Sequence, residues 1–154
     1  MTRELIILDE DKAWVRARVA ELDRAIAELG PEFYDVFNQS SETWHDNAPF
    51  DALRDRQAVL DAERQKLRTV LRESLPSVPR AIKGVVSVGS VVEVEDKKGV
   101  RRCYKIAGDW TPFAGEVRDG ATVVSARSPV AQELIGMTVG GATRYGVVAQ
   151  VHVI

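Results

Sequence analysis

The sequence predicts an α+β protein in which an N-terminal antiparallel coiled-coil hairpin precedes a small antiparallel β-sheet domain that carries one helix. Apolar residues recur every three or four positions in the first half of the chain, which indicates helices, and every second position after residue 80, which indicates strands. Pro76 and Pro79 separate the two patterns. The predicted domains are therefore residues 1–79 and residues 80–154.

The first helix is predicted from about Asp9 to Asn38. From Val15 onward its apolar spacings alternate between four and three, which is typical of a helix that packs along another helix. Pro31 removes one backbone hydrogen bond, but the pattern keeps its phase on both sides, so we expect one bent helix. The predicted contact positions are Leu8, Val15, Val19, Leu22, Ile26, Leu29, Phe33 and Val36.

The second helix is predicted to begin after Asp46 or Asn47, either of which can cap it. The connection from about Gln39 to Ala48 is short, which requires an antiparallel hairpin. Gln57 and Arg64 occupy two contact positions, so a larger helical assembly is disfavoured and a monomer is expected. The apolar contact positions are Phe50, Leu53, Leu60, Leu67 and Leu71.

The second half reads as strands joined by turns, with one short helix. Strands are expected around Val86–Val94, Arg102–Ala107, Ala121–Ala126 and Gly146–Ile154, and the run DKKG at Asp96–Gly99 predicts a turn. A helix is expected just after Ser128, the predicted N-cap. Pro129 suits its first position, and Gly136 suits its end.

Composition excludes several classes of protein. A chain that is 45% hydrophobic and 29% charged is expected to be soluble and folded. No apolar run approaches the roughly 20 residues that span a bilayer, and the first ten residues lack the apolar segment of a signal peptide, so we expect a cytoplasmic protein without a membrane partner. Cys103 has no partner for a disulfide, and its place in an alternating strand favours a core role over a nucleophilic one.

The charge is distributed unevenly, although the net charge is only -2. Residues 1–80 carry 12 basic and 16 acidic side chains, and residues 81–154 carry 9 and 7. This is not the balance of a general nucleic-acid binder, so contact with nucleic acid is expected only through a partner. The interval between Arg24 and Arg54 has no basic residue. An acidic hairpin end predicts a positive partner there, such as a metal ion or a basic channel. The acids are Glu28, Glu32, Asp35, Glu42, Asp46 and Asp51.

Three stretches resemble one family. The run SPVAQELIG at Ser128–Gly136 resembles the C-terminal signature of Gre-type (GreA/GreB) bacterial transcription elongation factors. The run YKIAGD at Tyr104–Asp109 is similar to a strand and turn at the matching place in that family. Asp46-Asn-Ala48, followed by Phe50 and Ala52, resembles the motif that starts the second coiled-coil helix. The order of parts, including the proline inside the first helix, also agrees.

This resemblance implies an FKBP-like C-terminal domain that docks at the secondary channel of bacterial RNA polymerase. It further implies that the coiled coil enters the channel and that tip carboxylates help to hold a second Mg²⁺ in the polymerase active site. There the polymerase cleaves its own backtracked transcript, so the contact with the RNA 3′ end is indirect. Mg²⁺ binds hard oxygen ligands, and a second ion can orient the attacking water. The protein would then be no stand-alone enzyme and would have no cofactor of its own. The implied docking residues are Ser128, Pro129, Gln132, Ile135 and Gly136.

The tip departs from the usual Asp-x-x-Glu-Asn-Ala pattern of the cleavage factors. Asp46 matches the glutamate but is one methylene shorter, and Thr43 stands where the aspartate is expected. Glu42, one residue earlier, is the candidate replacement. Two outcomes stay open: Glu42 and Asp46 ligate the shared Mg²⁺ and stimulate cleavage, or the altered tip occupies the channel and regulates without cleavage. The second is slightly favoured.

Each candidate tip residue also has an ordinary structural interpretation. Asp46 can serve only as an N-cap, and Glu42 can be a solvated loop acid. Trp44 can contact a partner or fold onto the hairpin, and His45 suits a surface position better than a metal site. Asn47 completes the tip motif.

Behind the tip, Arg54 and Arg56 are either ion-paired solvated charges or contacts to RNA and to acids of the channel.

Prolyl isomerase activity is a remote alternative, since an FKBP-like domain would need an aromatic-lined pocket for it. Its four aromatic residues show no clustering in the sequence: Tyr104, Trp110, Phe113 and Tyr145. The run from Gly140 to Gly146 leads into the last strand without the longer final hairpin of many family members. The sheet is therefore expected to be shorter near the implied docking surface.

Overall fold

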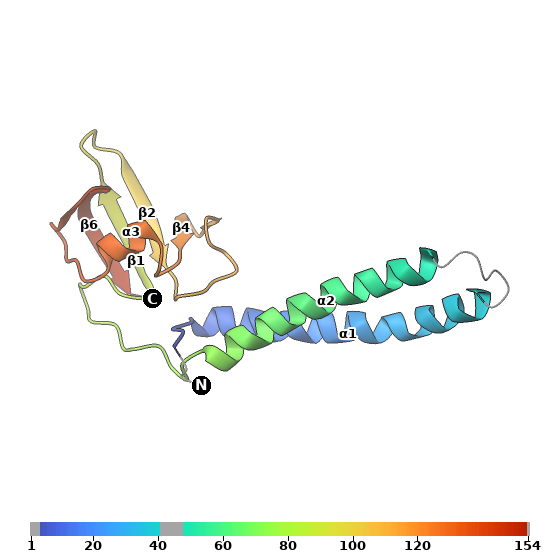
Figure 1. The fold of residues 1–154 in the computed structure, drawn as a ribbon. Helices are drawn as coiled ribbons and strands as arrows, with labels where there is room; N and C mark the ends of the chain where they lie inside the picture. The colour runs from blue at the N-terminus through green and yellow to red at the C-terminus, as the bar shows by residue number, and fades with distance from the viewer. Residues whose placement is uncertain (1–3, 41–47, 154) are drawn as a thin grey trace. The chain divides into compact units, whose positions relative to one another are not determined.

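The computed structural model describes residues 4–40 and 48–153 (Figure 1). Its contacts divide the chain into two units. Residues 13–72 form the hairpin unit, and residues up to Lys12 together with residues 73–154 form the C-terminal unit. The N-terminal segment therefore makes its contacts with the sheet domain, although the predicted domain division placed it with the helices.

The hairpin consists of α1 (Asp9–Ser40) and α2 (Ala48–Glu73), so the two predicted helices are confirmed. The predicted heptad positions Val15, Leu22 and Leu29 of α1 are at most 2% exposed. On α2 the buried contact position is Leu67. Pro31 lies inside α1, which continues past it as one helix, as the unbroken phase of the apolar pattern predicted.

The two helices are antiparallel, because residues late in α1 contact residues early in α2 and residues early in α1 contact residues late in α2. Phe33 and Phe50 pack edge to face with ring centroids 5.7 Å apart. Farther from the turn, the guanidinium of Arg18 binds both carboxylate oxygens of Glu63, at 2.9 and 3.0 Å. The hairpin is thus stabilised by a narrow apolar seam flanked by ion pairs.

Arg64 occupies a predicted seam position, but its charged end leaves the seam. It donates to Asp23 at 2.9 Å and to Asp61 at 2.6 Å, and its side chain is 22% exposed. A long side chain can bury its stem and keep its charge near water, which explains how arginine fits this position. Gln57, the other polar seam position, is exposed.

The C-terminal unit is built on one six-stranded sheet in the order β3-β4-β2-β1-β6-β5. The strands are β1 (Ser90–Glu95), β2 (Arg101–Ile106), β3 (Val117–Arg118), β4 (Ala121–Val124), β5 (Ala142–Thr143) and β6 (Gly146–Val153). The pair β2–β4 is parallel and the other pairs are antiparallel. The sheet is therefore mixed and not purely antiparallel. The chain leaves β2, passes through residues 107–120 with β3, and re-enters beside β2 in the same direction.

The core of this unit lies between the sheet and α3 (Pro129–Leu134). Ala131 and Leu134 of α3 are fully buried against valines and an isoleucine of the sheet. Because sheet residues alternate between the two faces, every second residue of β1 is buried. The sheet partners in this cluster are Val92, Val94, Ile106, Val124 and Val148.

The segments that join the strands agree largely with the sequence. Asp96–Gly99 forms the predicted turn, in which the Asp96 carboxylate accepts the backbone N–H groups of Lys98 and Val100. The short strands β3 and β5 had no sequence signal. Strand β5 forms a small hairpin with β6, which the run from Gly140 to Gly146 did not predict. Among the described residues, no helix is long and apolar enough to cross a membrane.

Candidate functional site

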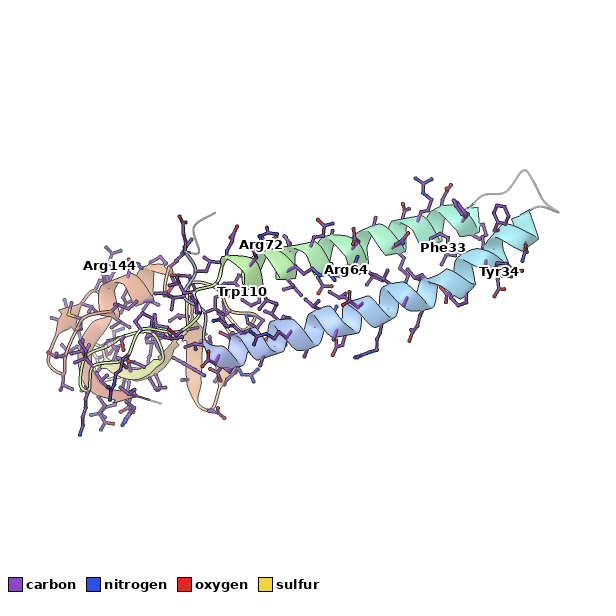
Figure 2. All side chains as sticks on the ribbon, turned by 90° about the horizontal axis from the view of Figure 1, so that it is seen from below. Phe33, Tyr34, Arg64, Arg72, Trp110 and Arg144 are labelled. Carbon is purple, nitrogen blue, oxygen red and sulfur yellow. The ribbon has the colours of Figure 1, made fainter. Side chains whose placement is uncertain are left out.

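Aromatic residues gather at the end of the hairpin next to the tip, on the last described turns of α1 and the first turn of α2. Tyr34 and Phe37 of α1 are 68% and 66% exposed. Phe33 and Tyr34 lie near this end of α1 (Figure 2), and Phe33 packs on Phe50. The five predicted tip residues lie outside the described residues, so their roles as ligands, caps or contacts stay predictions. They are Glu42, Trp44, His45, Asp46 and Asn47.

The helical turns of α1 and α2 that lie next to the tip carry acidic residues. On α1, Glu28, Glu32 and Asp35 are exposed, and Asp51 is exposed at the start of α2. Among described residues no three His, Cys, Asp or Glu side chains converge as a metal site. The acids therefore spread negative charge along the hairpin surface, where they attract a positively charged partner over a distance of about a Debye length, roughly 8 Å in physiological salt.

Arg54 and Arg56 are the first basic residues behind the tip on α2. Both are exposed, and neither forms an ion pair with a described residue.

In the C-terminal unit, α3 begins and ends as the sequence predicts. Ser128 is its N-cap and accepts the Ala131 N–H at 3.3 Å, while its own hydroxyl donates to Ser125 at 2.7 Å. Gly136 has φ +90°, a conformation that suits glycine just past a helix end.

The five predicted docking residues divide into two groups. Ser128 and Gly136 shape α3, and the Gln132 amide donates to the Ala126 carbonyl at 2.6 Å. Pro129 and Ile135 are exposed, and Ile135 is 38% exposed. Of the five predicted docking residues, Pro129 and Ile135 therefore offer an exposed apolar surface to a partner.

The run Tyr104–Asp109 joins the sheet to the N-terminal segment. A Cβ on Gly108 would lie 2.1 Å from the Ile6 carbonyl oxygen, so only glycine allows this approach. The Asp109 carboxylate accepts the Ile6 N–H at 2.7 Å, and the Asp109 N–H donates to the Ile6 carbonyl at 2.6 Å. This glycine–aspartate pair anchors the chain just ahead of α1.

With this geometry described, the comparisons with known proteins identify the second half of the chain. Residues 81–153 match the family model described as transcription elongation factor GreA/GreB, C-terminal. The C-terminal domain belongs to the GreA/GreB family. The resemblance carried by Tyr104–Asp109 and Ser128–Gly136 is thereby confirmed for this GreA/GreB domain.

Solved structures similar to the chain include two described as Gfh1 of named species. GreA factor homolog 1 (Gfh1) of Thermus thermophilus is 22% identical over 97% of this chain and 99% of that chain, with a TM-score of 0.39. Gfh1 of Thermus aquaticus is 21% identical over 98% and 99%, with a TM-score of 0.39. A third structure, titled as the transcription factor Gfh1, is 22% identical over 96% and 94%, with a TM-score of 0.44. No curated protein matches the chain.

Asp11 is a buried acid where the N-terminal segment meets the GreA/GreB domain. It is 2% exposed, and its Oδ2 has no hydrogen-bond partner among residues 4–40 and 48–153. Burial raises the pKa of Asp11, while a hydrogen bond with Thr111 opposes that rise. Between the ordinary pKa and the raised one the folded state binds more protons, so this group contributes stability at low pH that is lost as pH rises.

Cys103 lies half-buried in β2, and burial and then the Glu93 charge raise the pKa of its thiol. Because the thiolate is the nucleophile, a raised pKa makes this cysteine less reactive. Two aromatic residues of the domain border different pockets: Phe113 lines one and Tyr145 lines another.

Two features of the domain had no local signal in the sequence. The contact between Ile6 and Asp109 joins residues 103 positions apart, so no spacing rule predicts it. A group of basic side chains also comes together from the turn at Asp96–Gly99, from β2 and from the turn before β6: Lys97, Lys98, Arg102 and Arg144. No sequence spacing predicts that Arg144 lies beside the other three.

Proposed function

We propose that this protein binds bacterial RNA polymerase through its GreA/GreB domain and inserts the acidic hairpin into the secondary channel, where it regulates backtracked complexes. The observation that carries the proposal is the combination of a GreA/GreB domain with a two-helix hairpin whose turn end carries acids and no bases. The channel is the basic partner that such an end requires. We place this activity in the bacterial cytoplasm and expect the protein to act as a monomer.

The altered tip supports regulation by occupancy more than cleavage. Thr43 stands where a carboxylate is expected, and a hydroxyl group is a weaker ligand for Mg²⁺ than a carboxylate. If cleavage is stimulated, Glu42 and Asp46 supply the two carboxylates to a Mg²⁺ that the polymerase also holds. The reaction then belongs to the polymerase, and this chain orients an ion and a water.

The remaining predicted residues have distinct parts in this proposal. Trp44, His45 and Asn47 contact the inner channel, and Arg54 and Arg56 contact RNA or acidic groups of its wall. Exposed, unpaired guanidinium groups suit contacts to phosphates and carboxylates because they donate several hydrogen bonds in one plane. Docking of the domain uses the exposed side chains of Pro129 and Ile135, held in place by Ser128, Gln132 and Gly136.

The deciding experiment measures transcript cleavage by a backtracked bacterial polymerase with wild-type protein and with the Glu42→Ala, Asp46→Ala variant. Regulation by occupancy predicts no stimulated cleavage by wild type, slower elongation, and competition with a cleavage factor. The matched control is Glu28→Ala, Glu32→Ala, which removes the same charge from exposed positions of α1.

Two results would sharpen or overturn the proposal. Cleavage that disappears in the tip variant and persists in the control assigns the metal-binding role to Glu42 and Asp46. Absence of any effect on cleavage, elongation or competition contradicts channel binding itself.

Docking is tested separately with Ile135→Asp, which should weaken polymerase binding at least tenfold because a charge would be desolvated in the interface. Val117→Asp is the control, since Val117 is 71% exposed on β3 and lies outside the proposed surface. Equal binding by both variants and wild type would exclude the α3 end as the docking surface.

A further inference from the structure

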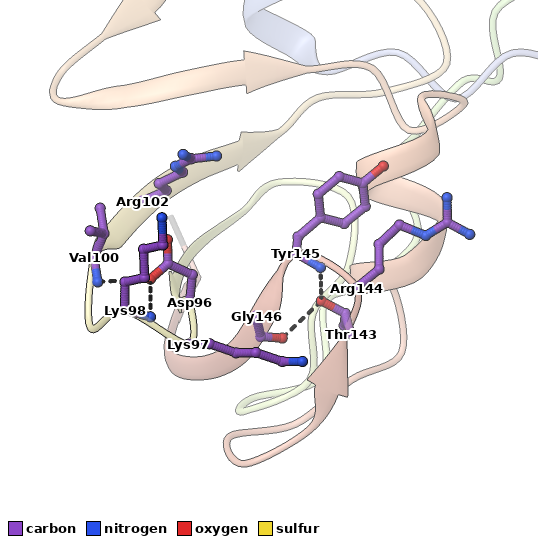
Figure 3. A pocket seen from close by; sticks show the side chains of 9 residues that line it. All are labelled: Asp96, Lys97, Lys98, Val100, Arg102, Thr143, Arg144, Tyr145 and Gly146. Atoms are coloured by element: carbon purple, nitrogen blue, oxygen red, sulfur yellow. Dashed lines mark hydrogen bonds between the residues drawn. The ribbon is translucent and has the colours of Figure 1, made fainter.

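The GreA/GreB domain carries a basic hollow between two turns (Figure 3). Its volume is about 510 Å³. Lys97 and Lys98 reach it from the turn between β1 and β2, Arg102 reaches it from β2, and Arg144 and Tyr145 reach it from the turn between β5 and β6. We define these residues as the basic hollow. It is distinct from the hairpin tip and from the exposed α3 residues Pro129 and Ile135.

The two turns are held together by a close approach of backbones. Gly146 has φ +132°, and a Cβ there would lie 2.4 Å from the Glu95 carbonyl oxygen. Glycine therefore lets the start of β6 pack against the end of β1, in register with Val147 opposite Glu95. The Thr143 hydroxyl donates to the Gly146 carbonyl at 2.8 Å and accepts the Tyr145 N–H at 3.1 Å. The hollow thus has a hydrogen-bonded backbone floor beneath exposed cationic side chains.

Three of the four cations that line the hollow differ from the paired cations of the C-terminal unit, whereas Arg144 is itself paired. Lys105, Arg118, Arg127 and Arg144 each form an ion pair with an acid of the C-terminal unit. In the part of the chain that the structure describes, Lys97, Lys98 and Arg102 form none. Three unpaired like charges around one hollow repel one another unless an anion binds there. Their arrangement indicates an anionic ligand.

Asp96 is the acid among the residues that line the hollow. Its carboxylate accepts the backbone N–H groups of Lys98 and Val100, at 2.8 and 3.0 Å, and offsets one of the positive charges there. Arg144 is paired with Glu133, at 3.1 Å. Lys97, Lys98 and Arg102 therefore outnumber the acid of the lining, which leaves an excess of positive charge at the hollow.

The same contacts select the kind of anion. Because Asp96 already occupies the two backbone N–H groups of the turn, the hollow offers no cradle of backbone donors for a single phosphate. It offers instead several charges on long side chains, which suit a series of phosphates along a flexible strand. Tyr145 is partly buried against the domain core, so only its remaining exposed surface, together with Val100, which is 49% exposed, adds apolar surface for bases.

We infer that the basic hollow binds single-stranded nucleic acid, contacting about three phosphates of its backbone through Lys97, Lys98 and Arg102. An acidic peptide would satisfy the charges but would leave the apolar surface of Tyr145 and Val100 without a flat partner. A net charge of -2 for the whole chain keeps this binding weak and dependent on low salt, in agreement with the absence of a general nucleic-acid-binding composition.

The test measures fluorescence anisotropy of a short labelled single-stranded RNA with the full chain in low salt and after a fourfold increase in salt. Single-stranded DNA, a duplex of the same sequence and an acidic peptide are compared as competitors. Three phosphate contacts predict a slope of log affinity against log salt near -2, so a fourfold increase in salt should weaken binding about 20-fold.

The variant Lys97→Gln, Lys98→Gln, Arg102→Gln should bind at least tenfold more weakly in low salt and lose most of its salt dependence. Its control is Arg16→Gln, Arg24→Gln, Lys66→Gln, which removes the same three charges from exposed positions of the hairpin. Far-UV circular dichroism of both variants confirms that each is folded.

Equal binding by wild type and by the hairpin control in low salt, with loss in the hollow variant, supports the inference, and the relative affinities for RNA and DNA then identify the source. Equal loss in both variants shows a general charge effect and overturns it. Stronger competition by the duplex or by the acidic peptide also overturns it. Because no polymerase is present, failure here leaves the proposed channel binding untested and intact.

Discussion

The hairpin unit and the GreA/GreB domain are stabilised in different ways. In the domain, α3 and the sheet enclose a continuous core that includes Leu134 and Ile106, both 0% exposed. In the hairpin, buried residues form a single row between two helices, and ion pairs such as Arg18–Glu63 flank it. A row of side chains buries less apolar area per residue than a layered core. The entropy cost of ordering each residue is therefore less well compensated in the hairpin.

This difference matches the functions proposed for the two units. A domain that docks on a partner needs one fixed surface, which a layered core provides. A hairpin that enters a channel must be narrow, and a two-helix cross-section allows no larger core. The hairpin is expected to open locally more often than the domain, which hydrogen exchange can measure unit by unit.

The largest expected contrast comes from the same substitution placed in each unit. Leu134→Ala in α3 should destabilise the domain by about 3 kcal/mol, because it removes a fully buried side chain and leaves a cavity. Leu60→Ala removes a half-buried leucine from α2 and should cost about half as much. Hydrogen exchange, resolved by peptide, reports each unit separately. Equal costs would show that the hairpin seam is as well packed as the domain core.

A gain in stability is expected in the hairpin from Pro31→Ala, by up to about 3 kcal/mol. Proline inside α1 lacks the N–H that the helix would use and crowds the preceding turn. Pro49→Ala is the control, since Pro49 lies in the first turn of α2, where proline is tolerated. Thermal unfolding followed by far-UV circular dichroism measures both. An unchanged midpoint for Pro31→Ala would mean that the helix has already adapted to its proline.

Within the domain, Gly146→Ala should destabilise by about 2 kcal/mol or more, since left-handed backbone strain is joined by a steric clash with Glu95. Gly120→Ala separates these causes. Gly120 also has positive φ, +79°, but its Cβ would meet nothing within 4 Å. The excess cost of Gly146→Ala over Gly120→Ala, measured by urea unfolding, is therefore the cost of the clash. If the costs are equal, the two backbones can separate without loss.

Features that depend on local spacing were predictable from the sequence. The heptad spacing around Val15 and Leu22 identified the helices, and alternation around β1 identified the central strand, because each period reports one buried face. The N-cap Ser128 with Pro129 located α3, since those residues satisfy the backbone groups at a helix start.

Features that depend on distant parts of the chain were not predictable. The parallel pairing of β2 with β4 depends on the path of the segment between them, which has no periodic signal. Strand β5 is two residues long, too short for alternation to be detected. For the candidate site, the acidic tip stays a prediction, because its residues lie outside the described ones. The basic hollow was not predictable, because Lys97 and Arg144 line one pocket only when two distant turns fold together.

The smallest expected effect concerns the ion pairs that flank the hairpin seam. Hydrogen bonds with Glu63 and then Glu21 raise the pKa of Arg18, so its charge is favoured in the folded state. Both partners are more than a third exposed, and solvent screening reduces the coupling to about 0.5 kcal/mol. A double-mutant cycle with Arg18→Met and Glu63→Gln measures it, and the coupling should shrink in high salt. A coupling several times larger, or one that salt leaves unchanged, would mean that ion pairs hold the hairpin together as strongly as apolar packing holds the domain.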